Sequence, residues 1–297
     1  MTDLSNFRFD VGHARKKGAA GLRRVDEGRM WVDQQYAGEL ERLGLASFDA
    51  VMNSASGRLL RTLPDRENWR LELSGESRRH VLFLKKHRVR SMAERLRSWI
   101  GSRGGATAGR VEADNVAALK QAGIDTMRVV AFGERVSGGL SQSFFMTEEL
   151  RGFTQLDHFV RQRFVPAAER TRRDQKLHAL AASVAEVARR FHAAGFNHRD
   201  FYCCHFFIRE LASRRFAIRL IDLQRVEQRR WLRGRWIVKD LAQLAYSAPR
   251  ERIGNTLRLA FIKRYLGVDH LSRADKRLIR RVLRRQQAMQ RRLGAHP

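Results

Sequence analysis

The sequence predicts an α+β fold in two parts, an antiparallel β-sheet followed by a mainly helical half. Three observations predict it. Short apolar segments with alternating polarity recur between residues 58 and 147, as in strands that are joined by turns. From Leu156 onward, apolar residues mostly recur at helical spacing. The helical half is interrupted by one polar stretch and two short strands, the second of which ends in an aspartate.

Length and charge indicate the organisation and the class of partner. For 297 residues we expect a basic N-terminal arm and lead-in over 1–45, a β-rich nucleotide lobe over 46–150, and a helical lobe with the acceptor site over 151–297. The formal charge of +28 implies nucleic acid, an anionic membrane surface, or an acidic substrate or protein as partner; a solvated basic surface is the alternative. No apolar run approaches the roughly 20 residues of a membrane span. We therefore expect a cytosolic protein, or one peripheral on a cytosolic membrane face.

The first half is expected to contain five strands, a short lead-in helix and one longer amphipathic helix. Residues 1 to about 25 are interpreted as an irregular arm, and Trp31 to Leu45 as a lead-in with a short helix. Strands follow at 58–63, 69–73 and 80–85, with turns at 64–68 and 74–77. An amphipathic helix runs from Arg110 to its stop signal Gly123, and two more strands lie at 127–132 and 143–147.

The second half begins with a hinge region and continues as helices. A helix over 177–191 is followed by the polar stretch 197–205 and by strands at 206–208 and 216–222. Residues 231–236 are an Arg/Trp cluster that either binds anionic sugar or phosphate groups or packs internally. Asp240, in the next helix, either buttresses the polar stretch or caps its own helix. The basic helix 271–293 either lies on an anionic membrane or docks onto its own lobe.

The polar stretch before the hairpin carries the chemistry. A helix, a loop with His-Arg-Asp, a β-hairpin and an aspartate at a strand end form the layout of a kinase catalytic loop and its metal-binding aspartate. Asp200 has the place of the carboxylate that orients or deprotonates the attacking hydroxyl, and Asp222 that of the ligand to Mg²⁺. His198 and Arg199 are expected to hold the loop together. Where a protein kinase has a metal-binding asparagine, this chain has His205, which either hydrogen-bonds a phosphate or favours a softer metal.

A second group of residues fits a nucleotide site. In a kinase, the third strand carries a lysine that pairs the phosphates, and here Lys85 takes this place, with Lys86 as its competitor. Adjacent strand residues face opposite sides, so only one of them can point to a cleft. Glu112 is the candidate partner of the lysine; a solvated lysine and a first-turn glutamate are the alternatives. Backbone groups near Glu148 and Leu150 are expected to bind an adenine edge. No Gly-rich phosphate loop precedes the lysine.

Together these motifs resemble the lipopolysaccharide core kinases of the Kdo/WaaP group, from about Arg58 to Ser247. The most specific motif is Asn197-His198-Arg199-Asp200-Phe201-Tyr202-Cys203-Cys204-His205-Phe206. A histidine five residues after the aspartate, with a cysteine just before it, is more similar to this family than to protein or aminoglycoside kinases. Further similar segments are Phe83–Arg88, Gly123–Met127, Thr147–Leu150, Leu220–Arg225 and Arg235–Leu241.

The resemblance implies a protein-kinase-like two-lobed fold and an ATP-dependent kinase that uses a divalent metal, Mg²⁺ or alternatively Mn²⁺. Its acceptor would be a sugar of the lipopolysaccharide inner core, with heptose favoured. Lys85, Glu112, Asp200, His205 and Asp222 fall on the family's matching positions.

The resemblance also implies work at the cytosolic face of the bacterial inner membrane, where the lipids and the core acceptor are both anionic. An acidic carrier protein is a further candidate partner, and no specific nucleic acid is expected. Two alternatives stay open. One is a kinase-fold phosphotransferase for a protein or another small molecule, and the other is a non-catalytic basic module that binds nucleic acid or membrane.

Overall fold

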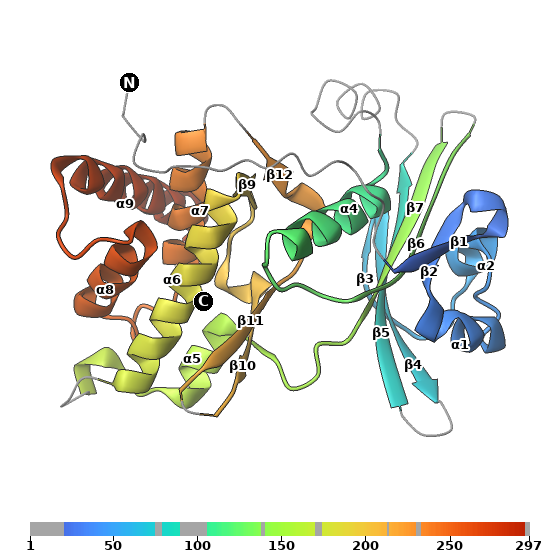
Figure 1. Ribbon diagram of the computed structural model, residues 1–297, viewed down its shortest axis with the longest axis horizontal. Coiled ribbons are helices and arrows are strands. Elements are labelled where there is room, and N and C mark those ends of the chain that lie inside the picture. The colour runs from blue at the N-terminus through green and yellow to red at the C-terminus, as the bar shows by residue number, and fades with distance from the viewer. Residues whose placement is uncertain are drawn as a thin grey trace. The chain divides into compact units, whose positions relative to one another are not determined.

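The computed structural model describes residues 21–74, 79–89, 106–137, 140–169, 174–212, 214–229 and 233–294. Within these ranges the chain forms two compact units (Figure 1). The sheet unit comprises residues up to 118 and residues 127–151, and the helical unit comprises residues 119–126 and those from 152 onward. The predicted α+β class, with an antiparallel sheet in one part and mainly helices in the other, is confirmed.

The sheet unit is built on seven antiparallel strands in the order β1-β2-β6-β7-β5-β4-β3. Their bounds are Leu22–Val25, Met30–Asp33, Arg58–Leu63, Arg66–Ser74, Arg79–Val89, Val129–Ser137 and Leu140–Glu148 for β1 to β7. Strand β7 lies at the centre of the sheet between β6 and β5, and these three strands supply many of the apolar side chains of the core.

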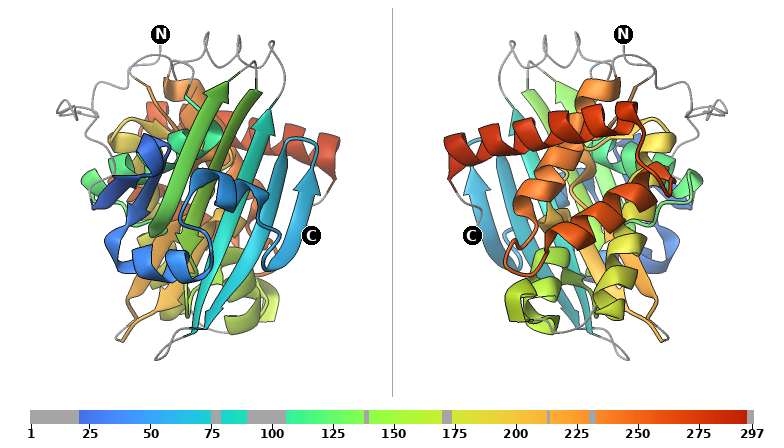
Figure 2. Two further views of the ribbon diagram at one scale, coloured as in Figure 1. Left: turned by 90° about the vertical axis from the view of Figure 1, so that its right-hand side faces the viewer. Right: turned by 90° about the vertical axis from the view of Figure 1, so that its left-hand side faces the viewer.

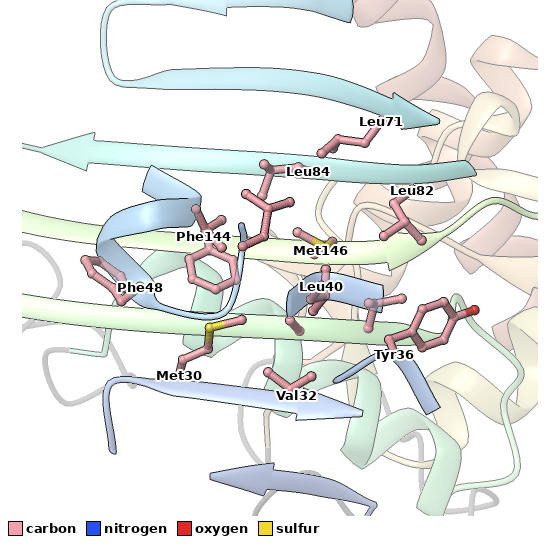
Figure 3. Packing of buried hydrophobic residues seen from close by; sticks show 14 of the residues in the cluster. Met30, Val32, Tyr36, Leu40, Phe48, Leu71, Leu82, Leu84, Phe144 and Met146 are labelled. Carbon is pink, nitrogen blue, oxygen red and sulfur yellow. The ribbon is translucent and has the colours of Figure 1, made fainter. Parts of the chain in front are cut away.

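One face of this sheet packs on two short helices, α1 (Ala37–Arg42) and α2 (Phe48–Asn53). Leu82 and Leu84 of β5 and Phe144 and Met146 of β7 point into this layer, in contact with residues such as Leu40 (Figure 3). Because successive strand side chains alternate between faces, the neighbours of these apolar residues along each strand, such as Lys85 next to Leu84, lie on the other face.

That other face carries α4 (Ala108–Gln121), on the side of the sheet opposite α1 and α2 (Figure 1). Its first turn approaches β7 closely, because the N–H of Gly109 donates to the Ser143 hydroxyl at 3.1 Å. A Cβ on Gly109 would lie 2.5 Å from the carbonyl oxygen of Phe144, so only glycine permits this approach. The close approach holds Glu112, one turn further along α4, against the sheet.

The helical unit contains α5 (Leu156–Arg163), α6 (Gln175–Ala193), α7 (Arg233–Ser247), α8 (Asn255–Leu266) and α9 (Arg273–Leu293). The strands β8 (Thr154–Gln155), β10 (Phe206–Glu210) and β11 (Phe216–Leu220) form a small sheet in the order β11-β10-β8. Strands β9 (Phe196–Asn197) and β12 (Glu227–Gln228) pair with each other. Helix α9 crosses α7 (Figure 2). None of the helices in the described ranges is both long and apolar enough to cross a bilayer.

Three expectations about the elements need correction. Residues 22–33 of the expected arm and lead-in form β1 and β2, because β2 pairs with β6 and extends the sheet. Strand β5 does not end at Lys85 but continues to Val89, because β4 and β7 pair with it beyond the lysine. Residues 119–126 belong with the helical unit, since the Leu220 N–H donates to the Asp125 carbonyl at 3.1 Å. Residues 1–20 of the arm and residues 231 and 232 of the Arg/Trp cluster lie outside the described residues.

Candidate active site

The loop after β9 is held by the face of helix α7. The carboxylate of Asp240, which is fully buried, accepts hydrogen bonds from the backbone N–H groups of His198 at 2.8 Å and Arg199 at 2.9 Å. Asp240 lies in the second turn of α7, so it buttresses the loop and does not cap its own helix. The sequence had left these two roles open.

Other residues on the same face of α7 complete this support. Lys239 and Gln243 donate to the carbonyl of Arg199 at 2.6 and 2.9 Å. The Ser247 hydroxyl accepts from the Cys203 N–H at 2.8 Å. This support is needed because Arg199 has a left-handed backbone with φ of +70°, which is unfavourable for any residue other than glycine. The hydrogen bonds from α7 stabilise that turn, which fixes the backbone on either side of Asp200.

His198 is a buried structural residue of this loop. Its Nε2–H donates to the Ile221 carbonyl at 3.1 Å, and its ring stacks on that of His205 with centroids 5.6 Å apart. Burial, followed by the neighbouring His205, lowers the pKa of His198 from 6.5 to about 4. The imidazole is therefore neutral near pH 7, where it links the catalytic loop to the segment before Asp222.

This buried histidine predicts a loss of stability in mild acid. The unfolded chain binds the His198 proton near pH 6.5 whereas the folded protein resists it down to about pH 4, so protonation favours unfolding and stability falls as the pH drops below 6.5. Between pH 7 and pH 5 we expect His198 to account for a decrease of about 2 kcal/mol in the free energy of unfolding. Urea titrations of the native protein and of His198→Gln measure it. An equally steep decrease in both proteins would contradict the assignment.

The hairpin β10–β11 brings His205 and Asp222 together. His205 immediately precedes β10, Asp222 follows β11, and the pairing of Phe206 with Leu220 places the two strand ends side by side. The His205 Nδ1 lies 2.7 Å from the backbone carbonyl oxygen of Asp200, which requires a proton on Nδ1. Nε2 is the ring nitrogen that does not face this carbonyl, and it lies 3.7 Å from the Asp222 carboxylate.

This pair of side chains fits a divalent metal. An imidazole that binds a metal through one nitrogen commonly donates from the other to a backbone carbonyl, as Nδ1 of His205 does, and a carboxylate suits Mg²⁺ or Mn²⁺. Within the described ranges no cluster of three or more His, Cys, Asp or Glu side chains is arranged to hold a metal. A site with two protein ligands matches the way in which nucleotide-bound Mg²⁺ is held, since phosphates and water supply the other oxygens.

Arg225 is a site residue to which sequence reasoning gave no role. Its Nη1 lies 2.9 Å from both carboxylate oxygens of Asp200, and half of its side chain is exposed. Arg225 ends the short 3₁₀ helix Leu223–Arg225, three residues after Asp222. The only signal was its place in the family-like segment Leu220–Arg225, because a contact across 25 residues leaves no local pattern.

In the sheet unit, Lys85 and Glu112 form an ion pair with Nζ 2.9 and 3.2 Å from the two carboxylate oxygens. The Glu112 carboxylate is fully buried, whereas 22% of the Lys85 side chain is exposed. The neighbouring Lys86 points to the other face, where its Nζ donates to the Ser54 carbonyl and lies 5.1 Å from the Trp69 ring centroid. Only Lys85 is therefore placed as a lysine that a helix glutamate holds.

The two residues expected to bind an adenine edge, Glu148 at the end of β7 and Leu150 just after it, differ in their backbone hydrogen bonds. The N–H of Glu148 donates to the Arg128 carbonyl at 3.1 Å, so it is already used within the sheet unit. The backbone N–H and carbonyl of Leu150 have no hydrogen-bond partner among the described residues. Of the two positions, Leu150 offers the free backbone groups.

The two cysteines beside Asp200 are packing residues. Cys203 is buried, and burial raises the pKa of its thiol to about 12. Burial likewise raises the pKa of the Cys204 thiol to about 11. Both thiols stay protonated near pH 7, which argues against a nucleophilic role.

Comparisons with known proteins agree with this site. A sequence model of the lipopolysaccharide kinase (Kdo/WaaP) family matches residues 54–265. The chain is 33% identical over 227 residues to the lipopolysaccharide core heptose(I) kinase WaaP of Pseudomonas aeruginosa, covering 75% of this chain and 81% of the relative. It is also 33% identical over 226 residues to the protein of that name from Escherichia coli strain K12, covering 74% and 81%.

A solved structure has a similar fold. It is WaaP in complex with acyl carrier protein, which superposes with a TM-score of 0.67 at 28% sequence identity and covers 88% of this chain and 99% of that chain. The matched residues 54–265 include the Lys85–Glu112 pair, the loop with Asp200 and the hairpin that ends at Asp222. The expectation drawn from the loop and its histidine is confirmed: the chain belongs to the lipopolysaccharide kinase (Kdo/WaaP) family.

Proposed function

We propose that this protein transfers the γ-phosphoryl group of ATP to a hydroxyl group of a heptose in the lipopolysaccharide core. The observation that carries the proposal is the catalytic loop, in which α7 holds the backbone around Asp200 and the hairpin brings His205 to Asp222. The relatives at 33% identity act on the same class of acceptor by their names. This supports a heptose over a protein as the acceptor.

Asp200 is the proposed base. Its carboxylate orients the acceptor hydroxyl and takes its proton as the new O–P bond forms and the bond between the γ-phosphorus and the leaving oxygen of ADP breaks. Arg225 occupies both oxygens of Asp200 in this structure. An acceptor hydroxyl must therefore displace or share this ion pair, which Arg225 can allow because its side chain is half exposed and lies at the surface.

The other proposed roles follow from the geometry above. Lys85, held by Glu112, pairs the nucleotide phosphates, and the free backbone groups of Leu150 bind the adenine edge, with Glu148 as its neighbour at the end of β7. Asp222 and His205 hold the divalent metal, which when bound neutralises charge on the transferred phosphate. His198 and Arg199 position the loop, and Arg199 is itself held by an ion pair with Glu227.

The test is transfer of labelled phosphate from ATP to purified, dephosphorylated lipopolysaccharide core, followed by mapping of the labelled sugar. The proposal predicts label on a heptose, in the presence of the core only. Label on another core sugar would change the acceptor but keep the kinase. Transfer to an added protein and none to the core would favour the alternative of a protein-directed phosphotransferase.

We also infer that the enzyme works at the cytosolic face of the bacterial inner membrane. Support comes from α9, where Arg273, Lys276, Arg277, Arg280, Arg281, Arg284, Arg285, Arg291 and Arg292 are exposed. No carboxylate of the described residues forms an ion pair with any of them. Such a surface is attracted to anionic lipid headgroups. Binding to vesicles that contain anionic lipid, lost at high salt and absent with neutral vesicles, is the expected result.

An acidic carrier protein is the second proposed partner, because the solved relative is a complex with acyl carrier protein. An apolar cavity of about 350 Å³ lies between the helices of the helical unit. Its wall includes Ala181, Val184, Leu241, Leu244 and Val282. Pockets of this size with an apolar lining accept small apolar ligands. We infer that it receives the acyl chain of a carrier protein.

A side chain that fills this pocket should distinguish the binding of the acyl chain from the binding of the carrier protein itself. In Ala181→Phe we expect the affinity for acylated carrier protein to fall by about tenfold or more, since several apolar contacts are lost. The affinity for the unacylated carrier should not change, and neither should that of the control Ala179→Phe, which lies off the cavity on the same helix. Calorimetric titration measures the six affinities, those of the native protein and of both variants for each carrier form. Equal affinity of the native protein for both carrier forms would rule out the acyl site.

A further inference from the structure

One aromatic ring near Asp200 gathers an unusual number of cations. The ring of Trp236, in the first turn of α7, has the guanidinium carbons of Arg229 and Arg235 each 4.7 Å from its centroid. The guanidinium carbon of Arg199 and the ammonium of Lys239 lie at 5.1 and 5.7 Å. Significant cation–π pairs occur about once in 70–80 residues. Four on one ring therefore point to a dedicated arrangement of positive charge.

The cations around Trp236 are only partly neutralised. Glu227 forms ion pairs with Arg199 and Arg229. Arg235 is exposed and forms no ion pair with any carboxylate in the described ranges. Lys239 donates to a backbone carbonyl, and burial together with the charge of Arg225 lowers its pKa. Like charges held this close repel each other, so an anion bound between them would stabilise the arrangement.

This group of cations is continuous with the proposed base. Lys239 bonds the carbonyl of Arg199, the residue immediately before Asp200, at 2.6 Å. Arg225, on the other side, bonds the Asp200 carboxylate itself. Any ligand that places a hydroxyl on Asp200 thus has positive groups beside it.

We propose that Arg235 and Lys239, held by Trp236 and joined by Arg225, form an acceptor subsite for an anionic group on a sugar next to the one that is phosphorylated. The proposal rests on the kinase function proposed above and adds a specificity determinant to it. The chemical class is a saccharide carboxylate or phosphate, because guanidinium groups match both in geometry and charge. The role of Trp236 is to hold the cations, as its four cation–π contacts indicate.

The test compares acceptors that differ only in their charged groups. Native protein, Arg235→Gln and the control Arg250→Gln, an exposed arginine elsewhere in the helical unit, are each assayed with intact, carboxyl-reduced and phosphate-free core. With intact core we expect KM to rise about two- to fivefold in Arg235→Gln, as for the loss of one largely exposed ion pair. The KM for ATP and the behaviour of Arg250→Gln should stay as in the native protein.

The acceptor arms identify the anion. If the group is a carboxylate, the carboxyl-reduced core raises the KM of the native protein to that of Arg235→Gln and does not change the KM of the variant. If the group is a phosphate, the phosphate-free core has these two effects on KM instead. An unchanged KM for intact core in Arg235→Gln would overturn the subsite and leave the kinase function standing. A native protein without transfer to any acceptor would overturn the kinase function instead, and the subsite with it.

Discussion

Asp200→Asn should lower kcat for phosphate transfer to the core by about 10²- to 10⁴-fold, the range that a positioned general base contributes. Asparagine keeps the size of the side chain but cannot take the proton of the acceptor hydroxyl. The KM for ATP should change little, because Lys85 and Glu112, the proposed nucleotide residues, lie in the sheet unit. Steady-state kinetics with a coupled ATP assay and intact core measure both constants.

The loss in Asp200→Asn has to be separated from a loss of folding. The substitution removes the ion pair with Arg225, but that side chain is 52% exposed, and pairs of this kind contribute about 1 kcal/mol or less. The melting temperature should therefore shift by only a few degrees. A folded variant that keeps more than a tenth of the native kcat would show that Asp200 is not the base.

Asp222→Asn should lower kcat by about 10²- to 10⁴-fold, because the proposed metal site loses its carboxylate and with it several kcal/mol of charge stabilisation. Asparagine is the suitable replacement, since Asp222 has a left-handed backbone with φ of 55° that asparagine also tolerates. A part of the activity should return at high metal concentration, and the measurement is kcat as a function of Mg²⁺ and Mn²⁺.

His205→Asn is the matched variant for this site. An amide oxygen is a better ligand for Mg²⁺ than imidazole nitrogen, whereas Mn²⁺ accepts both. The ratio of the activity with Mn²⁺ to that with Mg²⁺ should therefore fall several-fold in His205→Asn relative to the native protein. If this ratio is unchanged while Asp222→Asn still has a strongly reduced kcat, His205 does not bind the metal, and the remaining role for it is a hydrogen bond to a phosphate.

Much of the candidate site could be predicted because its parts are short motifs on regular elements. The loop with Asp200 follows the long amphipathic helix α6, and the strands around it have clear apolar runs. The spacing from Asp200 to His205 and Asp222 is thus preserved along the chain. The same local logic placed Lys85 on the third strand of a hairpin system and Glu112 on the helix that follows. Their catalytic roles remain predictions.

Other features could not be predicted, since they depend on contacts between distant segments. Residues 22–33 were expected to belong to an irregular arm and lead-in, because they become β1 and β2 only through pairing with β6, about 100 residues later. The two roles left open for Asp240 were decided by the backbone of His198 and Arg199, some 40 residues upstream.

The sequence by itself determined the fold class, the family and the identity of the chemistry-bearing residues, since apolar periodicity and motif spacing are local properties of the chain. Only the tertiary structure decided that Lys85 and not Lys86 pairs with Glu112, that Arg225 bonds Asp200, and that Trp236 gathers four cations. The first two contacts join side chains that are 25 or more residues apart, and the cluster on Trp236 forms only because Arg199, from the distant loop before Asp200, joins three cations that are close to Trp236 in the chain. Such meetings are set by packing and pairing in three dimensions, for which a single sequence holds no local signal.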